Sequence, residues 1–317
     1  MRLSSASFAG LLAGLCAQEP TFRTTVPLVI APTTITDKKG NYVDGLTEND
    51  FLLYDNRRPQ QIHMDVHSVP ISLVIAVQSS SLAAPSLLRI RKIGSMIEPL
   101  VIGERGEAAV FIFDSQVERI QGFTSDTQAL KRAFLSLRPG DAGSRMIDAV
   151  TASVRLLSKC PIQRRRVLLL IGETRDRSSE GKLEDAVTLA QLENVTVYPV
   201  TYSAFLTGFT AQPEAGAVEA GGGGINLLAI FAEIARLATT NAAEALSKYT
   251  GGRHLSFLKQ RSLEQAISHI GEELHSQYLL SFTPTVREEG TFHEIEVKVR
   301  DRTDVIVRTR PGYWLSN

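Results

Sequence analysis

The stretch Ile71-Ser72-Leu73-Val74-Ile75-Ala76-Val77 decides the fold, because it is apolar at every position except Ser72. A run of this kind predicts a strand that is buried on both faces, as in a parallel sheet covered by helices. Similar runs follow at residues 108–113, 167–171 and 195–202. The core of the protein is therefore expected to be a sheet of buried strands.

Segments with helical spacing of apolar residues separate these strands. They cover residues 85–100, 127–137, 146–157, 183–192, 227–249 and 263–274. This alternation predicts an α/β fold, with a doubly wound, mostly parallel sheet and helices on both faces. Ligands of such sheets bind beyond the carboxyl ends of the strands. Function is therefore expected in the loops after Val77, Ile171 and Tyr202.

The two ends of the chain have a different pattern, typical of antiparallel strands. Residues 24–67 are rich in Val, Ile and Thr with turn signals between them, and residues 293–299 alternate strictly between polar and apolar. Neither end is large enough to form a good core alone, so we expect the two to pair into one small antiparallel β module. The predicted organisation is a signal peptide (1–17), an N-terminal β segment (18–68), an α/β domain (69–276) and a C-terminal β segment (277–317).

The first residues resemble a secretory signal peptide. Arg2 precedes a short apolar run at residues 8–16, and Ala17 is a small residue at the expected cleavage point. Leu15 before Cys16 does not suit a lipobox, so cleavage after Ala17 is favoured over lipidation. The apolar run is too short to span a bilayer, and no transmembrane segment is expected in the mature chain. We expect an exported protein: periplasmic, in the cell envelope or secreted.

The overall charge excludes some classes of partner. The 317 residues carry 34 Lys and Arg against 34 Asp and Glu, so the net charge is zero. A protein without net positive charge has no general attraction to nucleic acid or to anionic membranes, and no nucleic-acid partner is expected. Cys160 would be the only cysteine left after cleavage, and we interpret it as a small buried hydrophobic residue.

The loop that follows the first core strand carries the most specific motif, Val77-Gln78-Ser79-Ser80-Ser81. Together with the helix after it, this loop resembles the first metal loop, Asp-x-Ser-x-Ser, of von Willebrand factor type A (VWA) domains. More narrowly, the chain resembles the VWA-related proteins of acidobacteria. The segments that carry this second resemblance lie at residues 36–51, 278–284, 292–299 and 310–313.

The resemblance implies a metal-ion-dependent adhesion site, in which oxygen ligands hold Mg²⁺ or Mn²⁺ and a partner's carboxylate completes the shell. The matching positions here are Ser79 and Ser81 in the first loop, Ser144 in the second and Glu173 in the third. Val77 stands where the first aspartate is expected, so a charge that offsets the dication is missing. The site is interpreted as degenerate, with no cofactor or at most weak Mg²⁺ or Mn²⁺. The favoured role for the three serines is therefore to cap helix N-termini.

Three functions are compatible with these motifs. The favoured one is a non-enzymatic protein-binding module that contacts its partner at the carboxyl edge of the sheet, near the glycine run 221–224. There Arg145 and Arg175 could pair with an acidic partner. A structural scaffold of an envelope assembly is the alternative. A hydrolase is disfavoured, because there is no Gly-x-Ser-x-Gly motif and because His269 and His275 are six residues apart instead of the four of a zinc protease.

Overall fold

The computed structural model describes residues 28–65, 69–202, 227–285 and 291–315. The predicted signal peptide and the glycine run 221–224 lie outside these residues. None of the helices in the described ranges combines the length and the hydropathy needed to cross a membrane.

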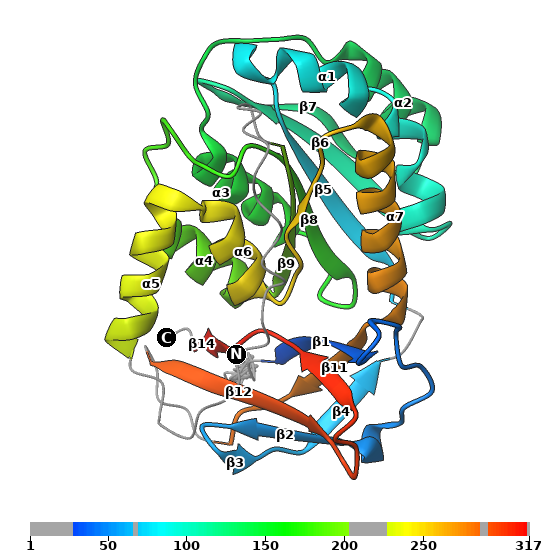
Figure 1. The fold of residues 1–317 in the computed structure, drawn as a ribbon, viewed down its shortest axis with the longest axis vertical. Helices are drawn as coiled ribbons and strands as arrows, with labels where there is room; N and C mark the ends of the chain where they lie inside the picture. The colour runs from blue at the N-terminus through cyan, green and yellow to red at the C-terminus, as the bar shows by residue number, and fades with distance from the viewer. Residues whose placement is uncertain (1–27, 66–68, 203–226, 286–290, 316–317) are drawn as a thin grey trace, which may run out of the picture.

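The centre of the molecule is a six-stranded sheet with the order β10-β9-β8-β5-β6-β7 (Figure 1). All neighbouring pairs are parallel except β6 with β7 at one edge. The predicted run at Ile71 is the central strand, and every residue of it is buried. In chain order, the strands are β5 (Ile71–Gln78), β6 (Glu107–Phe113), β7 (Val117–Thr124), β8 (Arg165–Gly172), β9 (Val195–Thr201) and β10 (Leu255–Ser256).

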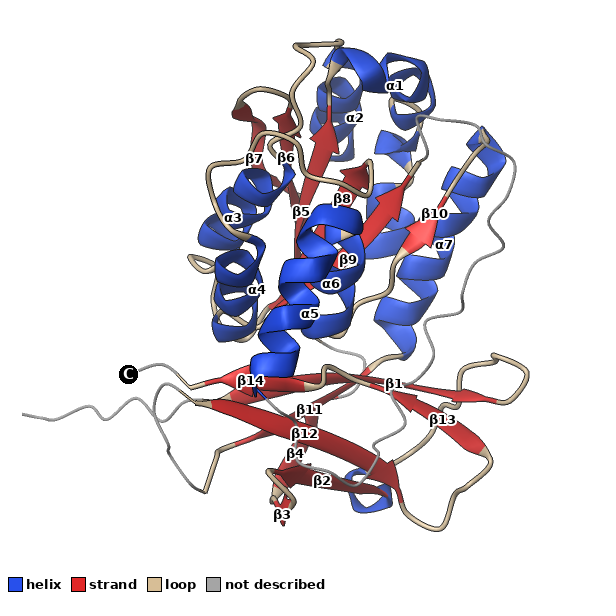
Figure 2. Cartoon of the chain, turned by 60° about the vertical axis from the view of Figure 1, so that its left-hand side comes forward, coloured by secondary structure: helices blue, strands red, loops and turns tan. Residues whose placement is uncertain are grey.

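Helices cover both faces of this sheet (Figure 2). Leu73, Ile75 and Val77 pack into the core on one face, and Val74 and Ala76 pack into the core on the other, as the two-residue period of a strand requires. The first core includes residues of α1, α2 and α7, and the second includes residues of α3 to α6. The helices are α1 (Ala84–Ile90), α2 (Thr127–Ser136), α3 (Met146–Leu157), α4 (Leu183–Leu192), α5 (Leu227–Thr240), α6 (Ala242–Thr250) and α7 (Gln260–Ser276).

The strand order creates one switch point, between β5 and β8. The chain runs from β5 outward through β6 to β7, and then returns to β8 on the other side and runs outward through β9 to β10. Loops leave the carboxyl ends of β5 and β8 in opposite directions, and this is where such sheets bind ligands. The carboxyl ends point away from the antiparallel sheets (Figure 2), so this edge is not covered by them.

The terminal segments form two four-stranded antiparallel sheets that share one hydrophobic core. One has the order β13-β1-β11-β4 and the other the order β14-β12-β2-β3, so each combines strands from both ends of the chain. The predicted α/β sheet with a paired terminal β module is thus confirmed, whereas the predicted domain boundaries stay a prediction. The strands are β1 (Val29–Asp37), β2 (Phe51–Asp55), β3 (Arg58–Pro59), β4 (Ile62–Asp65), β11 (Tyr278–Phe282), β12 (Phe292–Val299), β13 (Val305–Arg308) and β14 (Gly312–Trp314).

Two predicted helices were wrong in extent. The helix predicted over residues 85–100 ends as α1 at Ile90 and is followed by a 3-10 turn (Ile93–Ser95) and a π turn (Glu98–Ile102). Residues 227–249 form two helices, α5 and α6, instead of one. Asn241 lies between them, and its side-chain oxygen accepts a hydrogen bond from the backbone N–H of Glu244 at 3.1 Å. Asparagine is among the best N-cap residues because its side chain satisfies a backbone donor that the first turn leaves free. The Ala-rich composition concealed this new helix start.

A buried carboxylate connects the α/β unit to the antiparallel sheets. Glu273 on α7 has a side chain that is 1% exposed. Its carboxylate oxygens lie 2.9 Å from Nε of Arg253, which precedes β10, and 2.5 Å from Nη2 of Arg308 on β13. Arg308 also donates to the carbonyls of Gly251 and Gly252. This cluster of charges therefore holds the two parts of the molecule together.

Candidate functional site

Gln78 joins the two strands at the switch point. It ends β5 and is 1% exposed. Its Oε1 accepts a hydrogen bond from the backbone N–H of Glu173 at 2.8 Å, and its Nε2 donates to Ser80 Oγ at 2.9 Å. Gly172 makes room for this bridge, since a Cβ there would lie 2.9 Å from Gln78 Oε1. The first and third loops of the predicted site are thus linked by a neutral amide.

Val77, at the expected aspartate position, belongs to the hydrophobic core. It is fully buried and pairs in register with Ile112 on β6 and Ile171 on β8. A side chain at this position lies within a face of the sheet and packs against apolar neighbours. Val77 therefore contributes nothing polar to the loop above it.

The three predicted serines lie in different environments. Ser79 is buried, and its hydroxyl donates to the carbonyl of Phe113 at 3.4 Å, while Ser81 is exposed. Ser144 is 1% exposed, and its hydroxyl has no hydrogen-bond partner among the described residues. The favoured capping role was wrong, because Ser80 and Arg145 occupy the N-cap positions and neither makes a side-chain cap. Strand pairing orients Ser79, and Ser144 presents a buried hydroxyl oxygen that no described residue contacts by a hydrogen bond.

Glu173 is the buried acid of this edge. It is 5% exposed, and neither carboxylate oxygen accepts a well-aligned hydrogen bond from the described residues. Arg177 Nη2 lies 2.9 Å from Glu173 Oε2, so the two form an ion pair. Burial, and after it the nearby carboxylate of Glu173, raise the pKa of Tyr202 above its ordinary value. Tyr202 therefore stays protonated beside the acid.

The arginine of the ion pair is also connected to the second loop. The backbone N–H of Arg177 donates to the carbonyl of Ser144 at 3.1 Å, and the backbone N–H of Ser144 donates to Ser178 Oγ at 2.9 Å. The structure thus brings Ser144 and Glu173 together around Arg177. Ser81 is not part of this group, since its backbone N–H donates to the carbonyl of Asp141 instead.

The two predicted partner-binding arginines differ in availability. Arg145 Nε lies 2.7 Å from Asp148 Oδ2, and Arg145 Nη2 lies 2.8 Å from Glu180 Oε1. The hydrogen bond to Asp148 is the main cause that raises the pKa of Arg145. Arg175 is exposed, and its Nε donates to the carbonyl of Thr240 at 3.3 Å. Of the two, Arg175 is the one that a partner can reach without breaking an ion pair.

These residues do not fit a Mg²⁺ or Mn²⁺ ion. Such ions need several oxygen ligands and charge compensation. At this edge the one buried carboxylate faces a guanidinium, Val77 supplies no ligand, and Ser79 is bonded to the sheet. Within the ranges that the structure describes, no three Asp, Glu, His or Cys side chains gather closely enough to hold a metal. The negative charge of Glu173 is therefore neutralised by Arg177 of the same chain.

Sequence reasoning missed three residues of this edge: Gln78, Arg177 and Tyr202. Gln78 stands at a variable position of the motif. It ends the strand two residues before Ser80, so the two side chains lie on the same side of the backbone and can form a hydrogen bond. Arg177 follows Glu173 by four residues, a separation that allows an ion pair in a compact turn. No pattern in the sequence marks Tyr202 as a neighbour of Glu173.

Comparisons with known proteins find similarity only among solved structures, since no family model and no curated protein sequence matches the chain. A von Willebrand factor type A protein from Catenulispora acidiphila is 11% identical over 84% of this chain and 74% of that one, with a TM-score of 0.48. The conserved hypothetical protein BatB from Bacteroides thetaiotaomicron is 15% identical over 64% and 99%, with a TM-score of 0.44.

A third similar structure is proximal thread matrix protein 1 from the mussel byssus with a zinc-occupied MIDAS motif. It is 12% identical over 71% of this chain and 50% of that one, with a TM-score of 0.46. All of these TM-scores lie below 0.5, so the fold assignment rests on the strand order and on the burial of both sheet faces.

Proposed function

We propose that this chain is an exported, non-enzymatic protein-binding module of the VWA type, related to the acidobacterial proteins that its sequence resembles. We further propose that its adhesion site is degenerate and works without metal. The observation that carries the proposal is the ion pair between Glu173 and Arg177, 2.9 Å apart, where the resemblance places a metal ligand. The guanidinium supplies the positive charge that a divalent cation would supply elsewhere.

The partner in this proposal is acidic. Arg175 and Arg177 both lie on the loop after β8, and both residues are exposed. The side chain of Arg177 is 42% exposed, so one face of its guanidinium can contact a partner while the other faces Glu173. Guanidinium groups bind carboxylates through charge-assisted, often bidentate hydrogen bonds. A partner's carboxylate would thus meet an arginine where the intact family presents a metal.

The non-enzymatic part of the proposal is supported by the state of the hydroxyl groups. Ser79 donates to a backbone carbonyl of the sheet. One hydroxyl does contact an imidazole, since Thr201 Oγ1 lies 2.7 Å from His254 Nε2. Thr201 is 2% exposed, however, so a substrate cannot reach it without a rearrangement of the sheet edge.

The test combines metal titration with partner capture by the full mature chain. Mg²⁺ or Mn²⁺ at millimolar concentration should leave the thermal midpoint unchanged, because an ion that binds only the folded state must raise it. Capture of the native envelope partner should survive EDTA and be lost in Arg175→Glu. The matched control is Arg155→Glu, which reverses an exposed arginine in the last turn of α3.

A rise of the midpoint with either metal would contradict the degenerate site. Capture that EDTA abolishes, or that Arg175→Glu leaves intact, would contradict recognition through the arginines. Export is tested separately by N-terminal sequencing of the mature protein, whose first residue should be Gln18. A mature chain that still begins at Met1 would exclude the signal peptide.

A further inference from the structure

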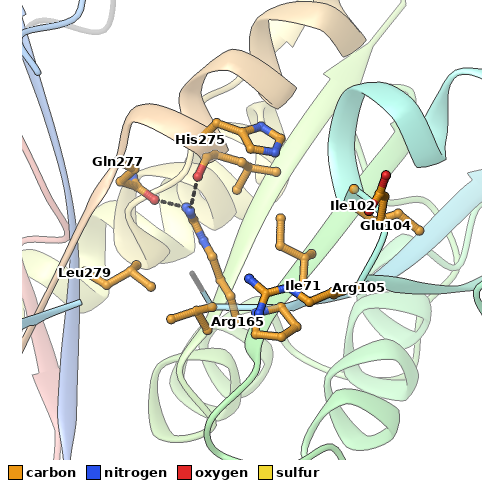
Figure 3. A pocket seen from close by; sticks show the side chains of 12 residues that line it. Ile71, Ile102, Glu104, Arg105, Arg165, His275, Gln277 and Leu279 are labelled. Atoms are coloured by element: carbon orange, nitrogen blue, oxygen red, sulfur yellow. Dashed lines mark hydrogen bonds between the residues drawn. The ribbon is translucent and has the colours of Figure 1, made fainter. Parts of the chain in front are cut away.

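A second site lies at the opposite edge of the parallel sheet, in a cavity of about 430 Å³ that faces the antiparallel sheets (Figure 3). It opens between the amino ends of β5 and β8, the end of α7 and the start of β11. It also borders the two chain connections between the α/β unit and the antiparallel sheets, near Pro70 and near Gln277. The lining residues include Pro70, Ile71, Ile102, Arg165, Gln277 and Leu279.

Arg165 is the unusual residue of this cavity, because its charge is buried without a counter-ion. It is 8% exposed. Its Nη1 donates to the carbonyl of Leu274 at 2.5 Å and its Nη2 donates to Gln277 Oε1, and Figure 3 shows both bonds as dashed lines. Both acceptors are neutral, and the buried Nε has no partner among the described residues. No carboxylate of the described chain lies within ion-pair distance of this guanidinium.

A buried, unpaired charge is unfavourable, and a bound anion would remove most of that cost. The charged groups around the cavity favour an anion. Arg105 and His275 stand at its exposed rim together with one acid, Glu104. The buried acid Glu273 attracts Arg165 electrostatically, but its ion pairs are with Arg253 and Arg308. Among the described residues, Arg165 therefore has no ion-pair partner of its own.

Apolar side chains form part of the remaining wall, and Leu279 is the partly exposed one among them. Ile71, Ile102 and Leu274 are each no more than 5% exposed. A cavity of this size that combines apolar side chains with a buried charged group can hold a small organic ligand. We propose that this cavity binds a short-chain aliphatic carboxylate, with its carboxylate toward Arg165 and its chain against Ile71 and Ile102. This inference is independent of the function proposed for the carboxyl edge.

Sodium hexanoate is the probe, and the readout is the thermal midpoint of the full mature chain at constant ionic strength. At 10 mM, hexanoate should raise the midpoint by at least about 2 °C, more than acetate does, because a ligand that binds only the folded state stabilises it. The neutral analogue hexanamide should have no effect. An equal effect of hexanamide, or of inorganic phosphate, would overturn the carboxylate assignment.

Two variants locate the site. Arg165→Met should weaken hexanoate binding in calorimetry by at least about tenfold, because the charged anchor is lost. If that variant does not fold, Leu279→Trp tests the same cavity, since it fills the partly exposed wall without changing Arg165. Leu258→Trp is the matched control at the other edge, where Leu258 is 59% exposed. Unchanged binding in Leu279→Trp, or no binding by the unaltered chain, would overturn the proposal.

Discussion

Replacing Glu273 by glutamine should destabilise the whole molecule, because this side chain connects its two parts. Glu273 is 1% exposed and contacts Arg253 at 2.9 Å and Arg308 at 2.5 Å. The change Glu273→Gln keeps the shape of the side chain and removes its charge. Two arginines would then face each other without a counter-ion.

The expected loss follows from the burial of the three groups. Breaking a buried ion pair by removing one partner costs about 3–5 kcal/mol. The side chain of Arg253 is 40% exposed and that of Arg308 is 23% exposed, so water compensates part of the lost interaction. Arg308 also keeps its hydrogen bonds to Gly251 and Gly252. We therefore expect the lower limit, about 3 kcal/mol, which corresponds to a fall in the midpoint of roughly 6–12 °C.

Urea unfolding followed by circular dichroism measures this loss. The matched control is Glu272→Gln, because Glu272 is the neighbouring glutamate on α7 and its side chain is 55% exposed. Its loss should stay below about 0.5 kcal/mol, as for other exposed charges. The double variant Glu273→Leu with Arg308→Met should lose less unfolding free energy than the sum of the losses of Glu273→Leu alone and Arg308→Met alone. A loss below about 1 kcal/mol for Glu273→Gln, or an equal loss for both glutamines, would refute the reasoning.

Three further changes test other parts of the structure. Gly172→Ala should cost about 1–3 kcal/mol in urea unfolding, because the new Cβ would lie 2.9 Å from Gln78 Oε1, whereas Gly122→Ala, with nothing within 4 Å, should cost nothing. Asn241→Ala should cost about 1 kcal/mol and increase hydrogen exchange in the first turn of α6; unchanged exchange would contradict the cap. Burial raises the pKa of Asp148, but hydrogen bonds from Gly181, Arg145 and Glu180 outweigh it and hold that pKa below its ordinary value. The stabilisation by Asp148 should then be complete above about pH 4 and disappear as the pH falls through the lowered pKa. The difference in unfolding free energy between Asp148→Asn and the unaltered protein should therefore shrink below about pH 4. A constant difference from about pH 7 to about pH 3 would count against this role of Asp148.

The candidate site could be predicted only in part from the sequence. The absence of an acid at Val77 is a property of the sequence itself, and so is the acid at Glu173. Whether the carboxylate of Glu173 can bind a metal or a partner depends on which cation already pairs with it. The path of the loop after β8 decides this, because it places Arg177 Nη2 2.9 Å from Glu173 Oε2. The same loop brings Arg177 against the carbonyl of Ser144. Contacts between loops have no sequence period, so they could not be read in advance.

By itself, the sequence determined the architecture, because buried strands require unbroken apolar runs and helices require a repeating apolar face. It also determined that the terminal segments pair, since neither can bury a core alone. Only the tertiary structure decided how they pair, in two sheets that combine both chain ends, and where buried charges meet. Arg165, Glu273 and Arg308 are ordinary charged residues in the sequence, and their roles arise because folding brings distant segments together and excludes water from between them.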